Sequence, residues 1–235
     1  KDLKIIIGGS SQVSGGVYKM PYHAINFLEV HDDYCFSDFL RLSSGENNKN
    51  DIILNKLNHI SLSKKLTKMN KLGAFILFTS QGVPLIHQGQ EWGHSQIIQQ
   101  TNIADSNVHK MDSNPYNKDN ETNWVNWNEL KQNADLVDFY KRLITIRKEN
   151  PHLRRTHSAA IDFIDLNNRF GLGYRINDKM VAFINGDNKN SIEVSLPKGT
   201  WNQLINTGKL MNDNLNQLEE KVILEPISGI LLSQE

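Results

Sequence analysis

The chain has 235 residues, which is enough for one large or two modest domains. Its 26 Lys and Arg balance its 26 Asp and Glu, so the composition gives no sign of a surface for nucleic acid or for an anionic membrane. The sequence contains no apolar run long enough for a membrane span, and its single cysteine, Cys35, excludes an internal disulfide; we expect it to be a small buried residue.

The first part of the chain alternates short apolar runs with polar loops. Residues 1–24 predict a strand or helix end followed by a Gly/Ser-rich loop. Residues 25–31 predict a buried strand. In residues 53–80, apolar positions recur at three- and four-residue steps, which predicts one or two amphipathic helices. The segment GVPLIHQGQEWG, residues 82–93, predicts a fully buried parallel strand.

The pattern changes towards the C-terminus. A long polar loop is predicted over residues 94–123, and a helix over 133–149 that ends before Pro151. After Pro151, short runs with period-two alternation are separated by Gly, Asn, Asp and Pro, which is typical of an antiparallel β-sandwich. We therefore predict α/β plus all-β architecture, with the domain boundary between residues 1–152 and 153–235.

His31, Asp32 and Asp33 directly follow the predicted strand at 25–31. In an α/β barrel, the carboxyl ends of the strands carry the catalytic groups. A carboxylate beside an imidazole could bind hydroxyls there, stabilise a developing positive charge or ligate a metal. Alternatively, Asp32 or Asp33 caps the helix that DDYCFSDFL predicts. Spacing alone does not separate these interpretations.

The chemistry of sugar cleavage offers one use for such a pair. Glycoside hydrolysis passes through an oxocarbenium-like state and needs paired carboxylates and partners for ring hydroxyls. Aromatic side chains could supply stacking faces for sugars, although each alone is more often a core residue. The aromatic candidates are Tyr34, Trp92, Tyr116, Trp124 and Trp127, of which we select Tyr34 and Trp92 as substrate-binding residues.

Several segments, in order, resemble one known enzyme family. INFLEVHDDY and GVPLIHQGQEWG are similar to motifs of its seventh and eighth barrel strands, and LITIRKENPHLRR to its last barrel helix. NPYNKDNETNWVNW is similar to the following loop of pullulanase, isoamylase and glycogen-debranching members. This family is glycoside hydrolase family 13, the α-amylase superfamily. The resemblance implies the C-terminal part of a (β/α)8 barrel (a TIM barrel) followed by an antiparallel β-sandwich domain.

The resemblance also implies roles for matching residues. Asp32 matches the carboxylate that stabilises the transition state, and His31 matches the histidine that hydrogen-bonds the sugar beside the cleaved bond. Asp119 matches an acid that holds a more distant glucose. Glu91 is either a substrate contact or a buried structural carboxylate. Asp33 stands where the family usually has Asn, which adds negative charge beside Asp32.

Two parts of the family's retaining mechanism, the Asp nucleophile and the Glu general acid, have no match in the sequence. The nearest match to the nucleophile's Gly-x-Arg-x-Asp is GYRIND, residues 173–178, with Asn177 in the fifth position. We read it as a surface strand and turn. A complete barrel takes about 250 residues. We therefore expect the C-terminal fragment of an α-glucan hydrolase, inactive alone, whose partners are the N-terminal half of the barrel and an α-glucan.

Several alternatives remain after this reasoning. The parent enzyme could prefer α-1,6 or α-1,4 linkages. The chain could instead be a non-catalytic carbohydrate-binding or structural protein derived from such an enzyme. An unrelated protein with a metal at His31 and Asp32 is disfavoured, because adjacent side chains on a strand point to opposite faces. We expect no cofactor; calcium is common in the family, but the sequence identifies no metal site.

Overall fold

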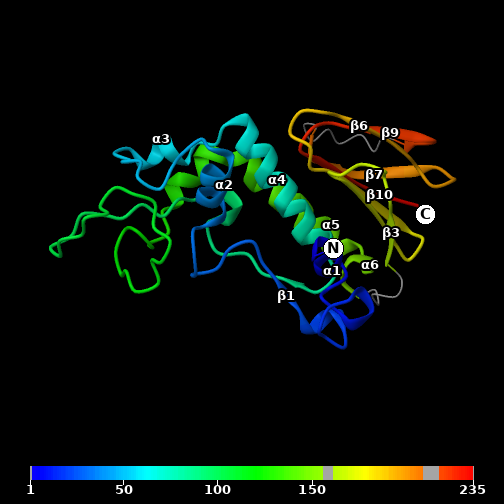
Figure 1. The fold of residues 1–235 in the computed structure, drawn as a ribbon, viewed down its shortest axis with the longest axis horizontal. Coiled ribbons are helices and arrows are strands. Elements are labelled where there is room, and N and C mark those ends of the chain that lie inside the picture. The colour runs from blue at the N-terminus through cyan, green and yellow to red at the C-terminus, as the bar shows by residue number, and fades with distance from the viewer. Residues whose placement is uncertain (1, 156–160, 209–216, 235) are drawn as a thin grey trace. The chain divides into compact units, whose positions relative to one another are not determined.

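The computed structural model describes residues 2–155, 161–208 and 217–234 (Figure 1). Their packing divides the chain into two compact units. The first unit comprises Lys1–Asn26, Lys71–Pro84 and Lys141–Glu235; the second comprises Phe27–Asn70 and Leu85–Tyr140. The domain boundary after residue 152 stays a prediction.

The helices agree with the apolar periodicity of the sequence. The α-helices are α1 (Asp2–Ile7), α2 (Phe36–Ser44), α3 (Lys56–Ile60), α4 (Lys64–Thr79), α5 (Ala134–Glu149) and α6 (His152–Arg155). Short 3-10 helices are η1 (Gln12–Ser14), η2 (Pro21–His23), η3 (Gln90–Trp92) and η4 (Trp127–Asn133). Helices α3, α4 and α5 confirm the helices predicted over 53–80 and 133–149. Among the described helices, none has both the length and the apolar character that crossing a membrane requires.

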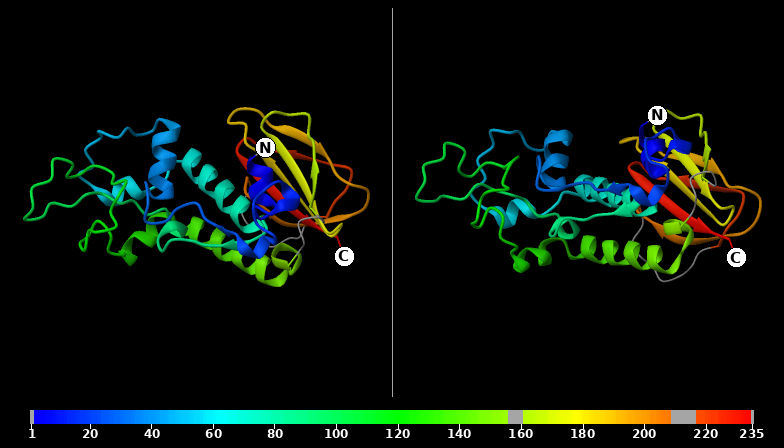
Figure 2. Two further views of the ribbon diagram at one scale, coloured as in Figure 1. Left: turned by 60° about the horizontal axis from the view of Figure 1, so that its bottom comes forward. Right: turned by 90° about the horizontal axis from the view of Figure 1, so that it is seen from below.

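The C-terminal strands form two antiparallel sheets, coloured yellow to red in Figures 1 and 2. The strands are β3 (Ile161–Ile164), β4 (Gly171–Ile176), β5 (Met180–Asn185), β6 (Ile192–Ser195), β7 (Trp201–Asn206), β8 (Gln217–Leu218), β9 (Lys221–Leu224) and β10 (Ser228–Ser233). One sheet has the order β3-β4-β5-β10-β7-β8, and β6 pairs with β9 in the other. This confirms the antiparallel strands predicted after Pro151. The sequence GYRIND forms the end of β4 and a turn, as expected, but its strand part does not lie at the surface. Tyr174 and Ile176 are fully buried, whereas Asn177 and Asp178 in the turn are exposed.

One hydrophobic core joins the two sheets. Phe183 and Ile230, from the central strands β5 and β10, are fully buried in it, together with Val194 and Leu224 from the small sheet. Trp201 completes this core, and its indole N–H donates to the Pro197 carbonyl at 2.8 Å. Each large apolar side chain buried here contributes about 1.5–3 kcal/mol. The period-two alternation of the sequence therefore agrees with these strands, whose inward-facing apolar residues form the core.

The opposite face of the large sheet packs on the end of α4. A Cβ atom added at Gly229 would lie 2.8 Å from the ring of Phe75, so the helix approaches the strand where no side chain intervenes. The hydroxyls of Thr79 and Tyr174 share a hydrogen bond of 2.5 Å. Arg147 of α5 donates to the Ser80 carbonyl at 2.9 Å. These contacts bury both faces of the central strands.

Strands β1 (Ile25–Asn26) and β2 (Val83–Pro84) form a parallel pair. The strand predicted over 25–31 is therefore only two residues long. The prediction of a fully buried strand in GVPLIHQGQEWG is wrong, because Val83 is 46% exposed. The strand predicted over 25–31 is not fully buried either, because Ile25 is 60% exposed. Within the described residues β1 and β2 pair only with each other, so their apolar side chains have little to pack against.

Candidate functional site

A loop of residues 27–35 follows β1 and carries the predicted charged trio. His31 Nε2 lies 3.4 Å from Asp32 Oδ1, and the two side chains are 68% and 77% exposed. Asp33 has a φ of 63° and accepts a hydrogen bond from the Tyr34 N–H at 2.8 Å. Asn and Asp are the non-glycine residues that adopt this left-handed conformation most readily. The backbone thus explains why Asp can stand where the family resemblance implies Asn.

The capping role considered for Asp32 or Asp33 is not observed. Helix α2 begins after Cys35, whose side chain makes no capping hydrogen bond. Instead, the Glu29 carboxylate accepts a hydrogen bond from the Phe36 N–H. Glu29 therefore connects the start of the loop to its end, while Asp32 and Asp33 stay exposed to solvent.

Glu29 is the buried anchor of this loop. Its Oε1 lies 2.8 Å from His94 Nε2 and 3.2 Å from His87 Nδ1. Burial alone would raise the pKa of Glu29, but the charge of His94 and hydrogen bonds from His87, His94 and the Phe36 N–H hold it below the usual value. Burial alone would lower the pKa of His94, but the charge and hydrogen bond of Glu29 raise it. The geometry favours a carboxylate–imidazolium pair.

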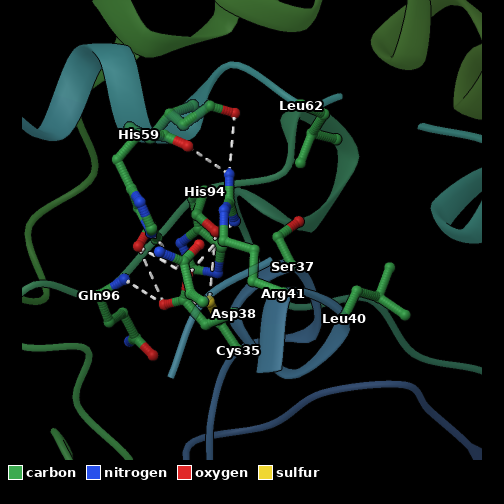
Figure 3. Close-up of polar contacts among 12 residues, drawn as sticks. Cys35, Ser37, Asp38, Leu40, Arg41, His59, Leu62, His94 and Gln96 are labelled. Carbon is green, nitrogen blue, oxygen red and sulfur yellow. Dashed lines mark hydrogen bonds and ion pairs between the residues drawn. The ribbon is translucent and has the colours of Figure 1, made fainter. Parts of the chain in front are cut away.

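A second buried carboxylate, Asp38, lies in the same region as His94 (Figure 3). Its Oδ1 accepts from Ser95 Oγ at 2.7 Å and lies 3.3 Å from Arg41 Nη1. Its Oδ2 accepts from the Gln96 N–H at 3.1 Å. Burial acts to raise the pKa of Asp38, but hydrogen bonding to His59, the charge of Arg41 and the Ser95 hydroxyl lower it. Asp38 thus connects α2 with residues 94–96.

Arg41 and Cys35 complete the buried network (Figure 3). Arg41 Nη2 donates to the carbonyls of His59 at 2.5 Å and Ile60 at 3.2 Å. Cys35 Sγ lies 3.2 Å from Asp38 Oδ2 and from the His94 carbonyl. Burial, reinforced by the charges of the nearby carboxylates, raises the pKa of the Cys35 thiol well above its usual value. This confirms the prediction that Cys35 is buried.

Glu29, Cys35 and His94 bring three atoms that can bind metals within 4.8 Å of one another. A set with one sulfur and one nitrogen suits Zn²⁺ better than Ca²⁺, which prefers oxygen ligands. All three side chains are already hydrogen-bonded to protein groups, which accounts for their positions without a metal. We therefore assign the cluster a structural role, and the expectation that the chain has no cofactor stays untested.

The aromatic candidates behave differently from one another. Tyr34 is half-buried, packs against the cluster that includes Ile97, and has Lys49 Nζ 5.9 Å from its ring centroid. Trp92 is only 1% exposed and packs on Trp127 with ring centroids 5.4 Å apart. No face of Trp92 is open to a sugar ring, so its expected stacking role is corrected: η3 turns this side chain into the core.

Asp119 and Glu91 lie in the segments after β2. Asp119 is exposed, and its Oδ1 accepts from Trp124 Nε1 at 3.0 Å. Glu91 is half-buried, and its Oε2 accepts from the Gly89 N–H at 3.0 Å. This bond fits the structural interpretation of Glu91, whereas Asp119 remains accessible for a ligand.

The sequence reasoning did not select Glu29, Asp38 or His94 as site residues. A signal for Glu29 exists, since it lies between Leu28 and Val30 within a predicted buried strand, and a buried carboxylate requires partners. Its partner His94 is 65 residues away in the sequence. No local pattern specifies a pairing at that separation.

No family model matches the chain, but individual proteins do. An isoamylase from Flavobacterium sp is 29% identical over 156 residues, which is 62% of this chain and 18% of the relative. A glycogen operon protein GlgX homolog from Mycobacterium tuberculosis is 27% identical over 163 residues, 63% of this chain and 21% of the relative. A pullulanase from Bacillus subtilis is 24% identical over 239 residues, 96% of this chain and 29% of the relative.

Solved structures of pullulanases share the fold of this chain. A pullulanase from Bacillus acidopullulyticus has a TM-score of 0.76 and 21% identity, covering 99% of this chain and 26% of that one. A pullulanase from Anoxybacillus sp. LM18-11, complexed with maltotetraose, has a TM-score of 0.74 and 20% identity, covering 98% and 30%. The chain thus spans less than a third of these proteins. Its homologues are isoamylase, GlgX and pullulanase, which confirms the resemblance to debranching enzymes.

Proposed function

We propose that this chain is the C-terminal part of a debranching α-glucan hydrolase: the last part of a (β/α)8 barrel, followed by a β-sandwich. The single observation that carries the proposal is the exposed His31–Asp32 pair, which follows the parallel strand β1 in the sequence. The exposed apolar side chains of Ile25 and Val83 support it further, because additional barrel elements would cover them. The N-terminal half of the barrel would then be this chain's partner.

The proposed mechanism gives Asp32 an electrostatic role. Its carboxylate would lie opposite the positive charge that develops on the sugar in the oxocarbenium-like transition state. The His31 imidazole, 3.4 Å away, would hydrogen-bond a hydroxyl of that sugar and orient the carboxylate. Asp119 would hold a more distant sugar. The nucleophile and general acid would come from barrel strands outside this chain.

The names of the relatives support the proposed substrate class. Their names include isoamylase and pullulanase, and related structures were solved with maltotetraose and maltotriose. We propose a branched α-glucan, with cleavage of α-1,6 linkages; a preference for α-1,4 linkages is the second candidate. The NPYNKDNETNWVNW segment favours the first.

The experiment starts from the coding sequence upstream of Lys1. The proposal requires an open frame that encodes a Gly-x-Arg-x-Asp segment and a following strand with the acidic Glu. The longer protein should hydrolyse pullulan. In it, Asp32→Asn should lower kcat by at least about 10²–10³-fold, because it removes charge that stabilises the transition state, while the melting temperature stays close to wild type.

Three outcomes would contradict parts of this proposal. Attack on amylose but not on pullulan would remove the debranching assignment. Normal turnover of Asp32→Asn would remove the role of Asp32. A start codon directly before Lys1 would remove the enzyme and leave a non-catalytic carbohydrate-binding or structural protein.

A further inference from the structure

The second unit contains a groove that the proposed cleavage residues do not line. Its volume is about 420 Å³, and it is formed by α3, Gln99 and residues 121–129. This volume lies in the range of small-molecule sites, about 300–1,000 Å³. Its lining combines apolar and polar groups, so its chemistry restricts what it can bind.

Trp124 provides the largest apolar surface of the groove. Its side chain is 58% exposed, although the indole N–H is held by Asp119 at 3.0 Å. That hydrogen bond restrains the ring while leaving ring surface accessible. Leu57 and Val125, which are also exposed, line the same groove. An exposed, restrained indole with apolar neighbours is suited to packing against the C–H face of a sugar ring.

Polar groups line the rest of the groove. Gln99 and Asn126 contribute amides, and Glu121 contributes a carboxylate. Amides both donate and accept hydrogen bonds, and carboxylates accept them. Sugar hydroxyls also donate and accept, so they match this mixed set. Gln99 Nε2 donates to the Ile97 carbonyl at 3.0 Å, and Asn126 Oδ1 accepts from the Asn128 N–H at 3.1 Å. The two amides therefore offer a sugar their remaining hydrogen-bonding atoms.

The charges of the groove favour an uncharged ligand. Lys56 Nζ lies 3.1 Å from Glu129 Oε1, so these two charges largely neutralise each other. Glu129 is 2% exposed, and its Oε1 makes this ion pair but no hydrogen bond with another described group. A carboxylate can accept several hydrogen bonds. Glu121 makes no ion pair with another residue that the structure describes, and its charge would repel anions such as phosphates. A neutral polyhydroxylated chain meets no such barrier.

We propose that this groove binds a segment of α-1,4-linked glucan, with one glucose ring packed on Trp124. The choice of an α-glucan over other neutral saccharides rests on the proposed function. The existence of the groove does not depend on the proposed function, because its volume, exposed indole and paired charges do not involve His31 or Asp32. It serves as a binding site separate from the cleavage residues.

Fluorine NMR of the 235-residue chain labelled with 5-fluorotryptophan tests this directly. The chain has four tryptophans, and Trp124→Phe identifies the Trp124 resonance. Titration with maltotetraose should shift that resonance, while Trp201 in the sandwich core stays unchanged. Cellotetraose, which has β linkages, should shift it much less. Absence of a Trp124 shift at millimolar maltotetraose would overturn the proposal.

Affinity measurements by calorimetry add matched variants. Trp124→Ala should weaken maltotetraose binding about tenfold, and Trp124→Phe should weaken it less because a ring remains. Tyr116→Ala is the control, since Tyr116 is exposed but does not line the groove. Equal affinity of Trp124→Ala and wild type would also overturn the proposal.

The two proposals can fail separately. Asp32→Asn should leave binding at the groove unchanged. A Trp124-dependent interaction in a protein whose longer form does not cleave pullulan would support the groove and reject the enzyme. If the longer protein hydrolyses pullulan but Trp124→Ala leaves maltotetraose binding unchanged, the enzyme would be supported and the groove rejected.

Discussion

The large antiparallel sheet and the parallel pair β1–β2 differ in the burial of their apolar residues. In the sheet, Phe183 and Ile230 are fully buried against β6–β9, and Gly229 on the opposite face lies against Phe75 of α4. Both faces of the central strands are therefore covered. In the parallel pair, Ile25 and Val83 are largely exposed. The antiparallel part therefore supplies its own core, whereas among the described residues none forms the layers that usually cover strands such as β1 and β2. The difference predicts where substitutions cost stability.

The largest effect should come from the core between the sheets. Phe183→Ala removes a fully buried ring and should lower the free energy of unfolding by about 3–5 kcal/mol, since a cavity remains. Urea unfolding followed by circular dichroism measures this. A loss below about 1 kcal/mol would mean that β5 is not part of a packed core.

The buried base of the 27–35 loop should come next. Glu29→Gln removes the charge that pairs with His94 and should cost about 1.5–3 kcal/mol near pH 6. The lowered pKa of Glu29 means that its stabilisation is present above its unfolded pKa of about 4.5 and is lost as pH falls. The raised pKa of His94 means that its stabilisation is present below about 6.5 and is lost as pH rises.

The pair therefore contributes most between about pH 4.5 and 6.5, and Glu29→Gln should flatten the pH profile of stability there. Thermal melts at a series of pH values measure it. Asp32→Asn, at the exposed tip of the same loop, is the matched control and should keep the wild-type profile. Identical profiles for Glu29→Gln and wild type would contradict the buried ion pair.

The contact between the large sheet and α4 should show an intermediate effect. Gly229→Ala places a Cβ 2.8 Å from the Phe75 ring and should cost about 1–3 kcal/mol by overpacking. Gly186→Ala is its control, because the added atom meets only an ordinary 3.4 Å contact. Equal stability of the two variants in urea would show that the helix does not pack closely on β10.

The smallest effect belongs to the parallel pair. Val83→Ser changes an exposed side chain and should leave the free energy of unfolding within about 0.5 kcal/mol. The same urea measurement applies. A loss above 2 kcal/mol would mean that another surface covers Val83 in solution, which would remove the contrast between the two regions.

The sequence predicted the antiparallel strands after Pro151 and the helices α3 to α5, because their apolar residues follow the period of the element. It failed at residues 25–31 for a physical reason. Asn26 and Glu29 occupy buried positions and hydrogen-bond there, while Ile25 and Phe27 are exposed. An alternating pattern gives the period of a strand but not which of its faces turns inward.

The candidate site was also found only in part. The motif around His31 and Asp32 was recognisable from local sequence, but the groups that hold their loop were not. Glu29 and Asp38 meet partners near residue 94, and such pairings depend on how distant segments pack. Trp92 illustrates the converse, since its residue type suggested a binding role that its position in η3 excludes.

The reactivity of Cys35 can report on the opening of the junction between the 27–35 loop and α2. It is the sole thiol in the chain, and it lies buried at the point where the loop joins α2. A thiol reagent can reach the sulfur only when that junction opens, so the labelling rate in native buffer counts opening events without any added probe. Ligands that tighten the segment carrying His31 and Asp32 would register as slower modification.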